Sequence, residues 1–149
     1  MKAECLGRSR GGLTTKIHVV CDSRGLPLGI ALSPGQSHDS ICFEVAIEAV
    51  PLTQLPESLA GDKGYSCKRI RAWIERKGIN SVIPFKSNEN TPPGYELDRE
   101  SYRRRNVVER LIGWLKECRR IATRFEKRAK NFLAMLTLAA MRRLLKVAA

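Results

Sequence analysis

Apolar residues recur at alternate positions in the first third of the chain. Residues 15–20 (TKIHVV) alternate in this way and are rich in β-branched side chains, and residues 26–32 (LPLGIAL) form a second apolar run. Residues 22–25 (DSRG) between the two runs have the composition of a turn. The pattern therefore predicts two antiparallel strands that form a β-hairpin.

After the hairpin, the spacing of apolar residues changes to that of helices, interrupted by short strands. The predicted elements are, in chain order, a helix over 41–49 that Asp39 or Ser40 caps, a strand over 58–61, a helix over 66–77 that ends at Gly78, a strand over 79–84, a helix over 101–121 and a last helix over 128–147. Residues 1–12 show no periodicity, and residues 7–12 (GRSRGG) are interpreted as a flexible lead-in. This order predicts a mixed α/β fold in a single domain over 1–149, with helices able to cover both faces of a sheet.

The predicted helix over 101–121 carries the most informative spacing in the chain, within the segment YRRRNVVERLIGWLK. Because a helix turns by about 100° per residue, an unbroken helix places four side chains on a stripe about 60° wide: Tyr102, Arg105, Glu109 and Lys116. Apolar residues occupy the neighbouring arc. One aromatic ring, two cations and one carboxylate then share a face, which suits a site that holds a metal ion beside a phosphodiester.

A second candidate carboxylate, Asp62, follows the predicted strand over 58–61 within the segment GDKGY. Functional residues often follow the carboxyl ends of strands in α/β sheets, and the oxygens of Asp62 and Glu109 suit Mg²⁺. Paired Mg²⁺ ions at such a site activate the attacking oxygen and stabilise the leaving one, and the site usually needs three carboxylates. The alternatives are structural: Asp62 caps the next helix, and Glu109 pairs with Arg105 one helical turn away.

The distribution of charge favours a nucleic-acid partner. The net charge is +12, and residues 61–149 hold 22 Lys and Arg against 9 Asp and Glu, whereas residues 1–60 hold 5 against 6. Such a basic half is the electrostatic signature of a nucleic-acid binder. Tyr102, Arg105 and Lys116 are the candidates for contacts with phosphates or an unpaired base. The alternative is a solvated, solubilising surface.

Composition narrows the class of protein further. Hydrophobic residues make up 43% of the chain and charged residues 28%, which is typical of a folded globular protein. The five cysteines are scattered without a C-x-x-C pair, so the sequence predicts neither a zinc site nor disulfides, and reduced thiols indicate a cytoplasmic protein. No signal peptide is visible, and the longest apolar run, 132–141, is too short to span a bilayer.

Five motifs together resemble a known family: residues 12–18 (GLTTKIH), 32–39 (LSPGQSHD), 62–65 (DKGY), 105–109 (RNVVE) and 119–124 (RRIATR). The chain is similar, over about residues 7–145, to the C-terminal part of bacterial insertion-sequence transposases of the DDE class, in the branch with a Y-R-E-K signature. The resemblance implies a ribonuclease H-like fold, with a mixed sheet flanked by helices. It also implies Mg²⁺-dependent DNA cleavage and strand transfer at element ends, with Mn²⁺ as a substitute.

The resemblance assigns roles to single residues. Asp62 matches the second catalytic Asp of the family and Glu109 its catalytic Glu, so both are also candidate metal ligands; Tyr102, Arg105 and Lys116 match the rest of the signature. In the family, the first catalytic Asp lies on a strand upstream of the Gly/Arg-rich segment, and no strand ending in Asp precedes that segment here. We therefore expect the sheet to lack its first strand and the isolated chain to be inactive without a part encoded upstream, for example in an overlapping frame.

Two other functions stay open at this point. The first is a catalytically inactive DNA-binding remnant or regulator of transposition, which the basic half of the chain favours. The second is a stand-alone nuclease of similar fold, which needs a third acid at Asp22 or Asp39. The expected partners are DNA, as transposon ends and target, and a second copy of the chain, because a sheet without its first strand exposes an unpaired edge.

Overall fold

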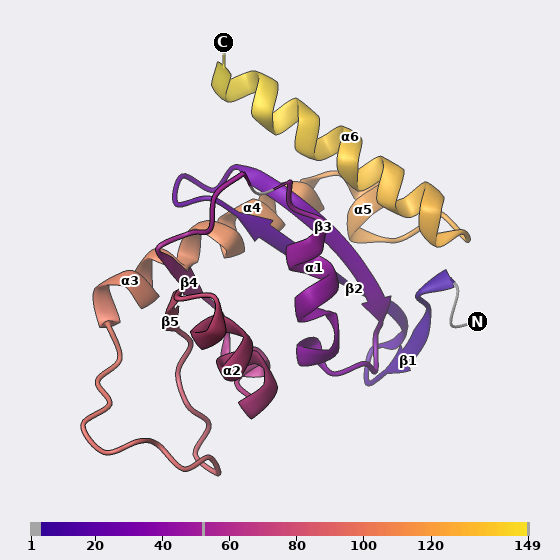
Figure 1. The fold of residues 1–149 in the computed structure, drawn as a ribbon. Coiled ribbons are helices and arrows are strands. Elements are labelled where there is room, and N and C mark those ends of the chain that lie inside the picture. Colours follow the sequence, from indigo (N-terminus) through magenta and orange to yellow (C-terminus); the bar gives the residue numbers. More distant parts are fainter. Residues whose placement is uncertain (1–3, 52, 149) are drawn as a thin grey trace. The chain divides into compact units, whose positions relative to one another are not determined.

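The structure is a computed structural model that describes residues 4–51 and 53–148 (Figure 1). The chain divides into two compact units, each with its own buried apolar residues. The first unit comprises Met1–Pro51 and Val107–Ala149, and the second comprises Leu52–Asn106.

The first unit is built on an antiparallel sheet of three strands, in the order β1(Gly7–Ser9), β2(Gly12–Cys21) and β3(Pro27–Pro34). The predicted hairpin is confirmed, and Ile17 lies opposite Leu32 in its register. The carboxylate of Asp22 closes the turn, because its Oδ1 accepts hydrogen bonds from the backbone N–H of Arg24 at 2.9 Å and of Leu26 at 2.8 Å. The polar side chain of Asp22 therefore stabilises the turn.

The N-terminal segment differs from the predicted flexible lead-in, because it contains the strand β1. Gly7 pairs with Thr14 and Ser9 with Gly12. Gly7 is buried, and a Cβ atom at this position would lie 1.5 Å from Oε1 of Gln36. The strand thus depends on close approach of its backbone to neighbouring residues, and three residues without a large apolar side chain leave no periodic pattern in the sequence.

The helix predicted over 41–49 is present, but its start differs from the prediction. It begins as a 3₁₀ turn, η2(Asp39–Cys42), which continues into α1(Phe43–Glu48). His38 occupies the N-cap position of η2 and makes no side-chain capping bond. Asp39 instead accepts a hydrogen bond from Nζ of Lys16 at 2.8 Å. This ion pair to a neighbouring strand engages the carboxylate that local sequence rules assign to the helix cap.

Helices cover both faces of the hairpin in this unit, as the order of elements predicts (Figure 1). Alternate residues of β3 point to opposite faces. Gly29 faces α1 and the residues after it: a Cβ atom there would lie 3.2 Å from the carbonyl oxygen of Ala46 and 2.7 Å from Cγ2 of Val50. Ile30 and Leu32 pack on a buried cluster from the helices α4(Asn106–Glu117), α5(Arg119–Ala122) and α6(Ala129–Ala148). This cluster consists of Leu111, Leu115, Ile121, Phe132 and Leu136.

Two polar contacts tie the same unit together. The imidazole Nε2 of buried His18 lies 2.8 Å from Oγ of buried Ser33, across the hairpin. Burial lowers the pKa of His18 below its ordinary value of 6.5, although the nearby carboxylate of Asp39 acts in the opposite direction. Arg124, which precedes α6, donates from Nη1 to Oγ1 of Thr15 and from Nε to the carbonyl of Glu126. The last motif of the family resemblance therefore has a structural role.

The second unit contains a parallel pair of strands, β4(Ser58–Ala60) and β5(Asn80–Val82), connected by α2(Lys68–Arg76). Parallel neighbours need a crossover connection, which is usually a helix. Ile70 and Ile74 of α2 are fully buried, and Gly78 follows the helix with a positive φ of 65°. Both predicted strands, the predicted helix and its end at glycine are therefore confirmed, with shorter strands than the apolar runs suggested.

The single helix predicted over 101–121 is wrong. The structure has three helices in its place, α3(Arg99–Arg104), α4 and α5. At the first break, the backbone N–H of Arg105 donates to the carbonyl of Tyr102, three residues back, and the turn tightens. At the second break, Cys118 is extended, with φ −73° and ψ 108°. Because the helix is interrupted at Arg105, helical spacing alone no longer relates Tyr102 to Glu109 and Lys116.

The last helix, α6, is confirmed, and the described residues form a mixed α/β structure with small sheets. No helix within the described residues is long and apolar enough to cross a membrane.

Candidate functional site

Asp62 lies two residues after β4, where the backbone comes close to β5. The N–H of Gly61 donates to the carbonyl of Val82 at 3.4 Å, and a Cβ atom at Gly61 would lie 3.2 Å from Ile83. The exposed carboxylate of Asp62 accepts a hydrogen bond from the N–H of Lys63 at 2.7 Å and caps a short 3₁₀ turn, η3(Lys63–Tyr65). The capping role that we considered for this residue is therefore present, at η3 rather than at the next α-helix, and its carboxylate faces solvent.

The segment that carries Asp62 is held at its other end by a polar network. Ser66, which is fully buried, donates from Oγ to Oε2 of Glu89 and accepts from Nη2 of Arg71 at 2.6 Å. Arg71 also donates to the carbonyl of Ile83 at 3.1 Å. The hydrogen bond from Ser66, with help from the N–H of Lys86 and the charge of Arg71, lowers the pKa of Glu89 below its ordinary value. The Asp62 segment is thus fixed between a backbone contact and a charged network.

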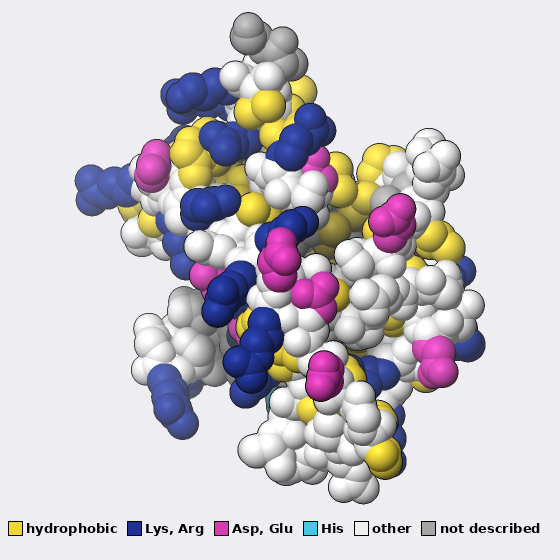
Figure 2. All heavy atoms as spheres, turned by 90° about the vertical axis from the view of Figure 1, so that its left-hand side faces the viewer, with side chains coloured by type: hydrophobic (Ala, Val, Ile, Leu, Met, Phe, Trp, Pro, Cys, Tyr) yellow, Lys and Arg dark blue, Asp and Glu magenta, His cyan; other side chains and the backbone are white. Residues whose placement is uncertain are grey.

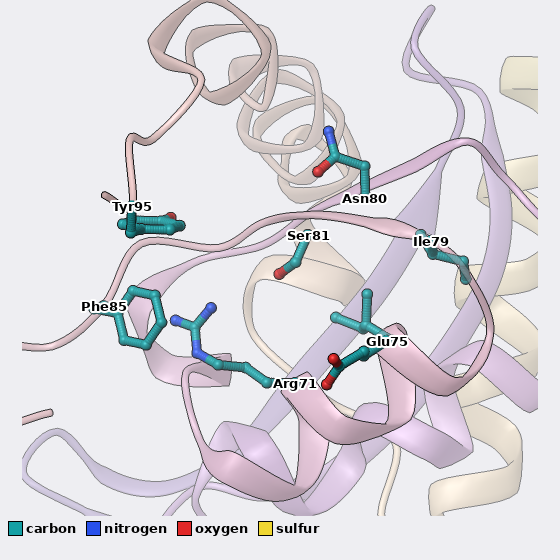
Figure 3. A pocket seen from close by; sticks show the side chains of 8 residues that line it. Arg71, Glu75, Ile79, Asn80, Ser81, Phe85 and Tyr95 are labelled. Atoms are coloured by element: carbon teal, nitrogen blue, oxygen red, sulfur yellow. The ribbon is translucent and has the colours of Figure 1, made fainter. Parts of the chain in front are cut away.

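Beside this network lies a small open pocket between α2 and the segment that follows β5 (Figure 3). The guanidinium carbon of Arg71 lies 3.4 Å from the ring centroid of Phe85, and Phe85 meets Tyr95 edge to face at 4.7 Å. The hydroxyl of Tyr95 donates to the carbonyl of Ile83 at 3.3 Å. Arg71 is not among the residues predicted from the sequence, because it lies about 100° from Ile70 around the helix axis, where helical spacing does not show whether a cation points inward.

Tyr102 and Arg105 belong to the same unit as Asp62, and the structure brings the two together. The guanidinium carbon of Arg105 lies 5.3 Å from the ring centroid of Tyr102, within the range of a cation–π contact. Both side chains are half-buried. Two members of the predicted signature are therefore neighbours, although they do not share an unbroken helix with the other two.

Glu109 and Lys116 belong to the first unit, where both lie on α4. The opposite side of this helix is anchored by Leu111 and Leu115, which are buried in the core cluster. Glu109 and Lys116 are exposed and lie seven residues apart, so they fall within about 20° of each other around the helix axis. The predicted carboxylate and cation thus share one exposed face of α4.

Carboxylate oxygens are the ligands that Mg²⁺ prefers, so the chemistry of Asp62 and Glu109 suits this ion. The two residues belong to different units, and the structure describes each carboxylate only in the surroundings of its own unit. Across residues 4–51 and 53–148, no group of three or more His, Cys, Asp or Glu side chains is arranged to hold a metal ion.

The two acids that a stand-alone nuclease would need have structural partners. Burial raises the pKa of Asp22, but hydrogen bonds from Leu26 and Arg24 outweigh this effect, and the net shift is downward. Asp39 forms its ion pair with Lys16 at 2.8 Å. Both carboxylates are therefore engaged in holding the hairpin and the loop that follows it.

Cationic side chains are abundant on the surface of the protein. Figure 2 shows Lys and Arg side chains over much of one face, with Asp and Glu side chains between them. Residues 99–149 hold 15 Lys and Arg against 4 Asp and Glu. The surface therefore has the positive charge expected of a protein that contacts phosphates.

Comparisons with known proteins agree with this chemistry. A sequence model of the transposase DDE domain family matches residues 5–144. A Burkholderia cepacia protein described as a transposase for insertion sequence element IS402 is 32% identical over 139 residues, and the match covers 88% of this chain and 62% of that protein. A Brucella ovis protein described as a transposase for insertion sequence element IS6501 is 32% identical over 127 residues, covering 85% of this chain and 95% of that protein. No solved structure matches the chain.

The chain therefore belongs to the transposase DDE domain family, and the resemblance drawn from its motifs is confirmed. It spans less than two thirds of the length of the IS402 relative and nearly the whole of the IS6501 relative.

Proposed function

We propose that the chain is part of the catalytic domain of an insertion-sequence transposase, that its two units belong to one ribonuclease H-like fold, and that it takes part in DNA cleavage and strand transfer at element ends. The observation that carries this proposal is the match of the transposase DDE domain over residues 5–144 to a chain with an exposed Asp62 close after a strand and an exposed Glu109 on an anchored helix. The mixed α/β structure is compatible with this fold.

In this proposal, Asp62 and Glu109 hold Mg²⁺, or Mn²⁺ as a substitute. When bound, the metal supplies charge that stabilises the attacking and leaving oxygens of the phosphodiester. The bond to Lys63 and the Ser66–Glu89–Arg71 network keep Asp62 at a defined position, and the buried side of α4 does the same for Glu109. A third carboxylate, which we assign to a part encoded upstream, would complete the ligand set.

The DNA contacts in this proposal come from Tyr102, Arg105 and Lys116. Lys116 offers an exposed ammonium on the same face of α4 as Glu109, where it would meet a phosphate beside the reacting group. Arg105 and Tyr102 form a neighbouring cation and ring, which suit a phosphate and an unpaired base. The expected partners are transposon ends and target DNA, and the expected location is the cytoplasm.

The proposal is tested by strand cleavage and transfer on DNA that carries the ends of the element, with Mg²⁺ or Mn²⁺. We expect no activity from this chain alone and activity when the upstream part is joined to it. In the joined protein, Asp62→Asn and Glu109→Gln should each abolish cleavage while DNA binding is kept. Efficient transfer by the chain alone would refute the need for a third carboxylate, and full activity of either variant would refute its assigned role.

A catalytically inactive DNA-binding regulator of transposition is the second candidate, and the basic residues 61–149 favour it. Under this function, Asp62→Ala and Glu109→Ala should leave DNA affinity unchanged or higher, because each removes a negative charge near the phosphates. The joined protein should then show no cleavage at all. Loss of DNA binding in either folded variant would contradict this function.

A further inference from the structure

The helix α2 has a cationic surface to which the proposed function gives no role. Ile70 and Ile74 are fully buried and fix which side of the helix faces the strands. With about 100° per residue, the opposite side carries Ala72 at its centre, the exposed carboxylate of Glu75 near Lys68 at one margin, and three exposed cations: Lys68, Arg69 and Arg76. We name these three cations the basic face of α2.

Two members of the basic face of α2 are not neutralised by the protein. Among the described residues, Lys68 and Arg76 form no ion pair with a carboxylate, and Arg76 donates from Nε to the carbonyl of Ala72 within its own helix. Arg71 on the same helix differs, because it donates to Oγ of Ser66 and its guanidinium lies beside Phe85 in the pocket (Figure 3). The helix thus carries one inward arginine that supports the fold, and Lys68 and Arg76 face outward without a carboxylate partner among the described residues.

The surroundings of the basic face favour phosphates over bases as the anionic group. Lys77 lies with its Nζ 6.0 Å from the ring centroid of Trp73, so a cation lies beside the aromatic ring of this helix. Ala72 has a short side chain, which lets a polynucleotide backbone approach the helix. Lys68 and Arg76 lie about 12 Å apart along the axis, at 1.5 Å per residue, which spans more than one phosphate of a duplex strand.

The basic face also lies in the same unit as Asp62 and close to it in the chain. Asp62 precedes the first residue of α2 by six positions, and Lys63 between them is exposed. We propose that the basic face of α2 binds the phosphate backbone of duplex DNA beside the Asp62 segment. This inference rests on the proposed DNA-processing function and adds a sequence-independent contact to it, because phosphates are alike in every sequence.

The test compares two double variants of the full chain, each of which removes two positive charges. Lys68→Gln with Arg76→Gln changes the basic face of α2, and Arg8→Gln with Arg10→Gln changes two exposed cations in the N-terminal segment. Duplex DNA of unrelated sequences is titrated at several salt concentrations. Because each phosphate contact contributes about 0.9 to the slope of log K against log salt, the first variant should lose about 1.8 from the slope. Its loss of affinity relative to the unaltered chain should therefore grow by roughly 60-fold between about 1 M and 0.1 M salt.

The control variant should keep the affinity and slope of the unaltered chain, and Lys68→Arg with Arg76→Lys should restore most of the binding. Unchanged binding by the first variant, or an equal loss in both variants, would overturn the inference while the proposed function stands. Polyglutamate is a probe for an acidic protein partner. If polyglutamate binding is lost in the Lys68→Gln and Arg76→Gln variant while its DNA affinity is kept, the inference is overturned in favour of such a partner. Absence of salt-dependent DNA binding by the unaltered chain would overturn the inference and the proposed function together. Far-UV circular dichroism confirms that each variant folds.

Discussion

In the first unit, long strands and the helix α6 bury a contiguous apolar cluster that joins residues from distant parts of the chain, among them Leu32 and Phe132. In the second unit, strands of three residues and a long irregular segment are held by a polar network centred on Arg71. The first unit therefore depends mainly on removal of apolar surface from water. The second depends to a larger extent on hydrogen bonds, whose loss leaves buried polar groups unsatisfied.

The two tryptophans make this contrast measurable, because Trp114 belongs to the first unit and Trp73 to the second. Trp114 packs against the apolar cluster, and Trp73 lies on α2. Replacing one tryptophan by phenylalanine leaves fluorescence that reports the other unit alone.

The largest effect is expected for Phe132→Ala in the first unit. Phe132 is 1% exposed, and truncation of a fully buried phenylalanine costs about 3–5 kcal/mol through lost burial and the cavity left behind. The unfolding transition that Trp114 reports should move to much lower denaturant. Leu138→Ala, in the same helix at a side chain that is 60% exposed, is the matched control and should have little effect. Equal shifts of the Trp114 and Trp73 transitions in Phe132→Ala would show that the two units unfold as one.

A smaller effect is expected for Arg71→Met in the second unit. The change removes the donor to Ser66 and the charge beside Glu89 while it keeps most of the side-chain volume. Loss of a charged hydrogen bond to a buried group costs roughly 1.5–3 kcal/mol. The free energy of unfolding measured from Trp73 fluorescence should fall by this amount. Arg76→Met, on the exposed side of the same helix, should leave it unchanged. Stability unchanged by Arg71→Met would mean that apolar contacts alone hold the second unit.

The smallest effect concerns pH and the one buried histidine among the described residues, His18. Because burial lowers its pKa in the folded state, the unfolded chain binds more protons below the ordinary value of 6.5. The first unit should therefore lose stability as pH falls from about 7 through 6.5 toward the lowered pKa. His18→Gln should flatten this part of the pH profile of the Trp114 transition. His38→Gln is the matched control at an exposed histidine, and an unchanged profile in His18→Gln would contradict the assignment.

Local sequence patterns were sufficient to predict an element where that element buries one regular face. The hairpin, α2 and α6 follow from alternation or helical spacing, and Gly78 ends α2 with the positive φ that glycine favours. Patterns failed where a contact from elsewhere changed the local outcome. Asp39 pairs with Lys16 and leaves the cap to His38, and β1 depends on close backbone approach at Gly7.

The candidate site shows the same division. The identity of Asp62 and Glu109 as candidate carboxylates, and the family itself, came from residue types and their spacing. The arrangement of Tyr102, Arg105 and Lys116 did not follow from that spacing, because the backbone tightens at Arg105 and divides the predicted helix. A prediction from helical spacing assumes that the backbone hydrogen bonds of the helix continue without a break. The local sequence does not show where they are interrupted.

The sequence by itself determined the class of elements, the positive charge of residues 61–149 and the membership in a transposase family, since these depend on residue type and short-range order. Only the tertiary structure decided which charged side chains point inward. Arg71 and Arg76 lie five positions apart on one helix, yet the first stacks on Phe85 and the second faces solvent. Burial of a charge depends on partners that fold onto it from distant segments, and those partners are known only once the chain has folded.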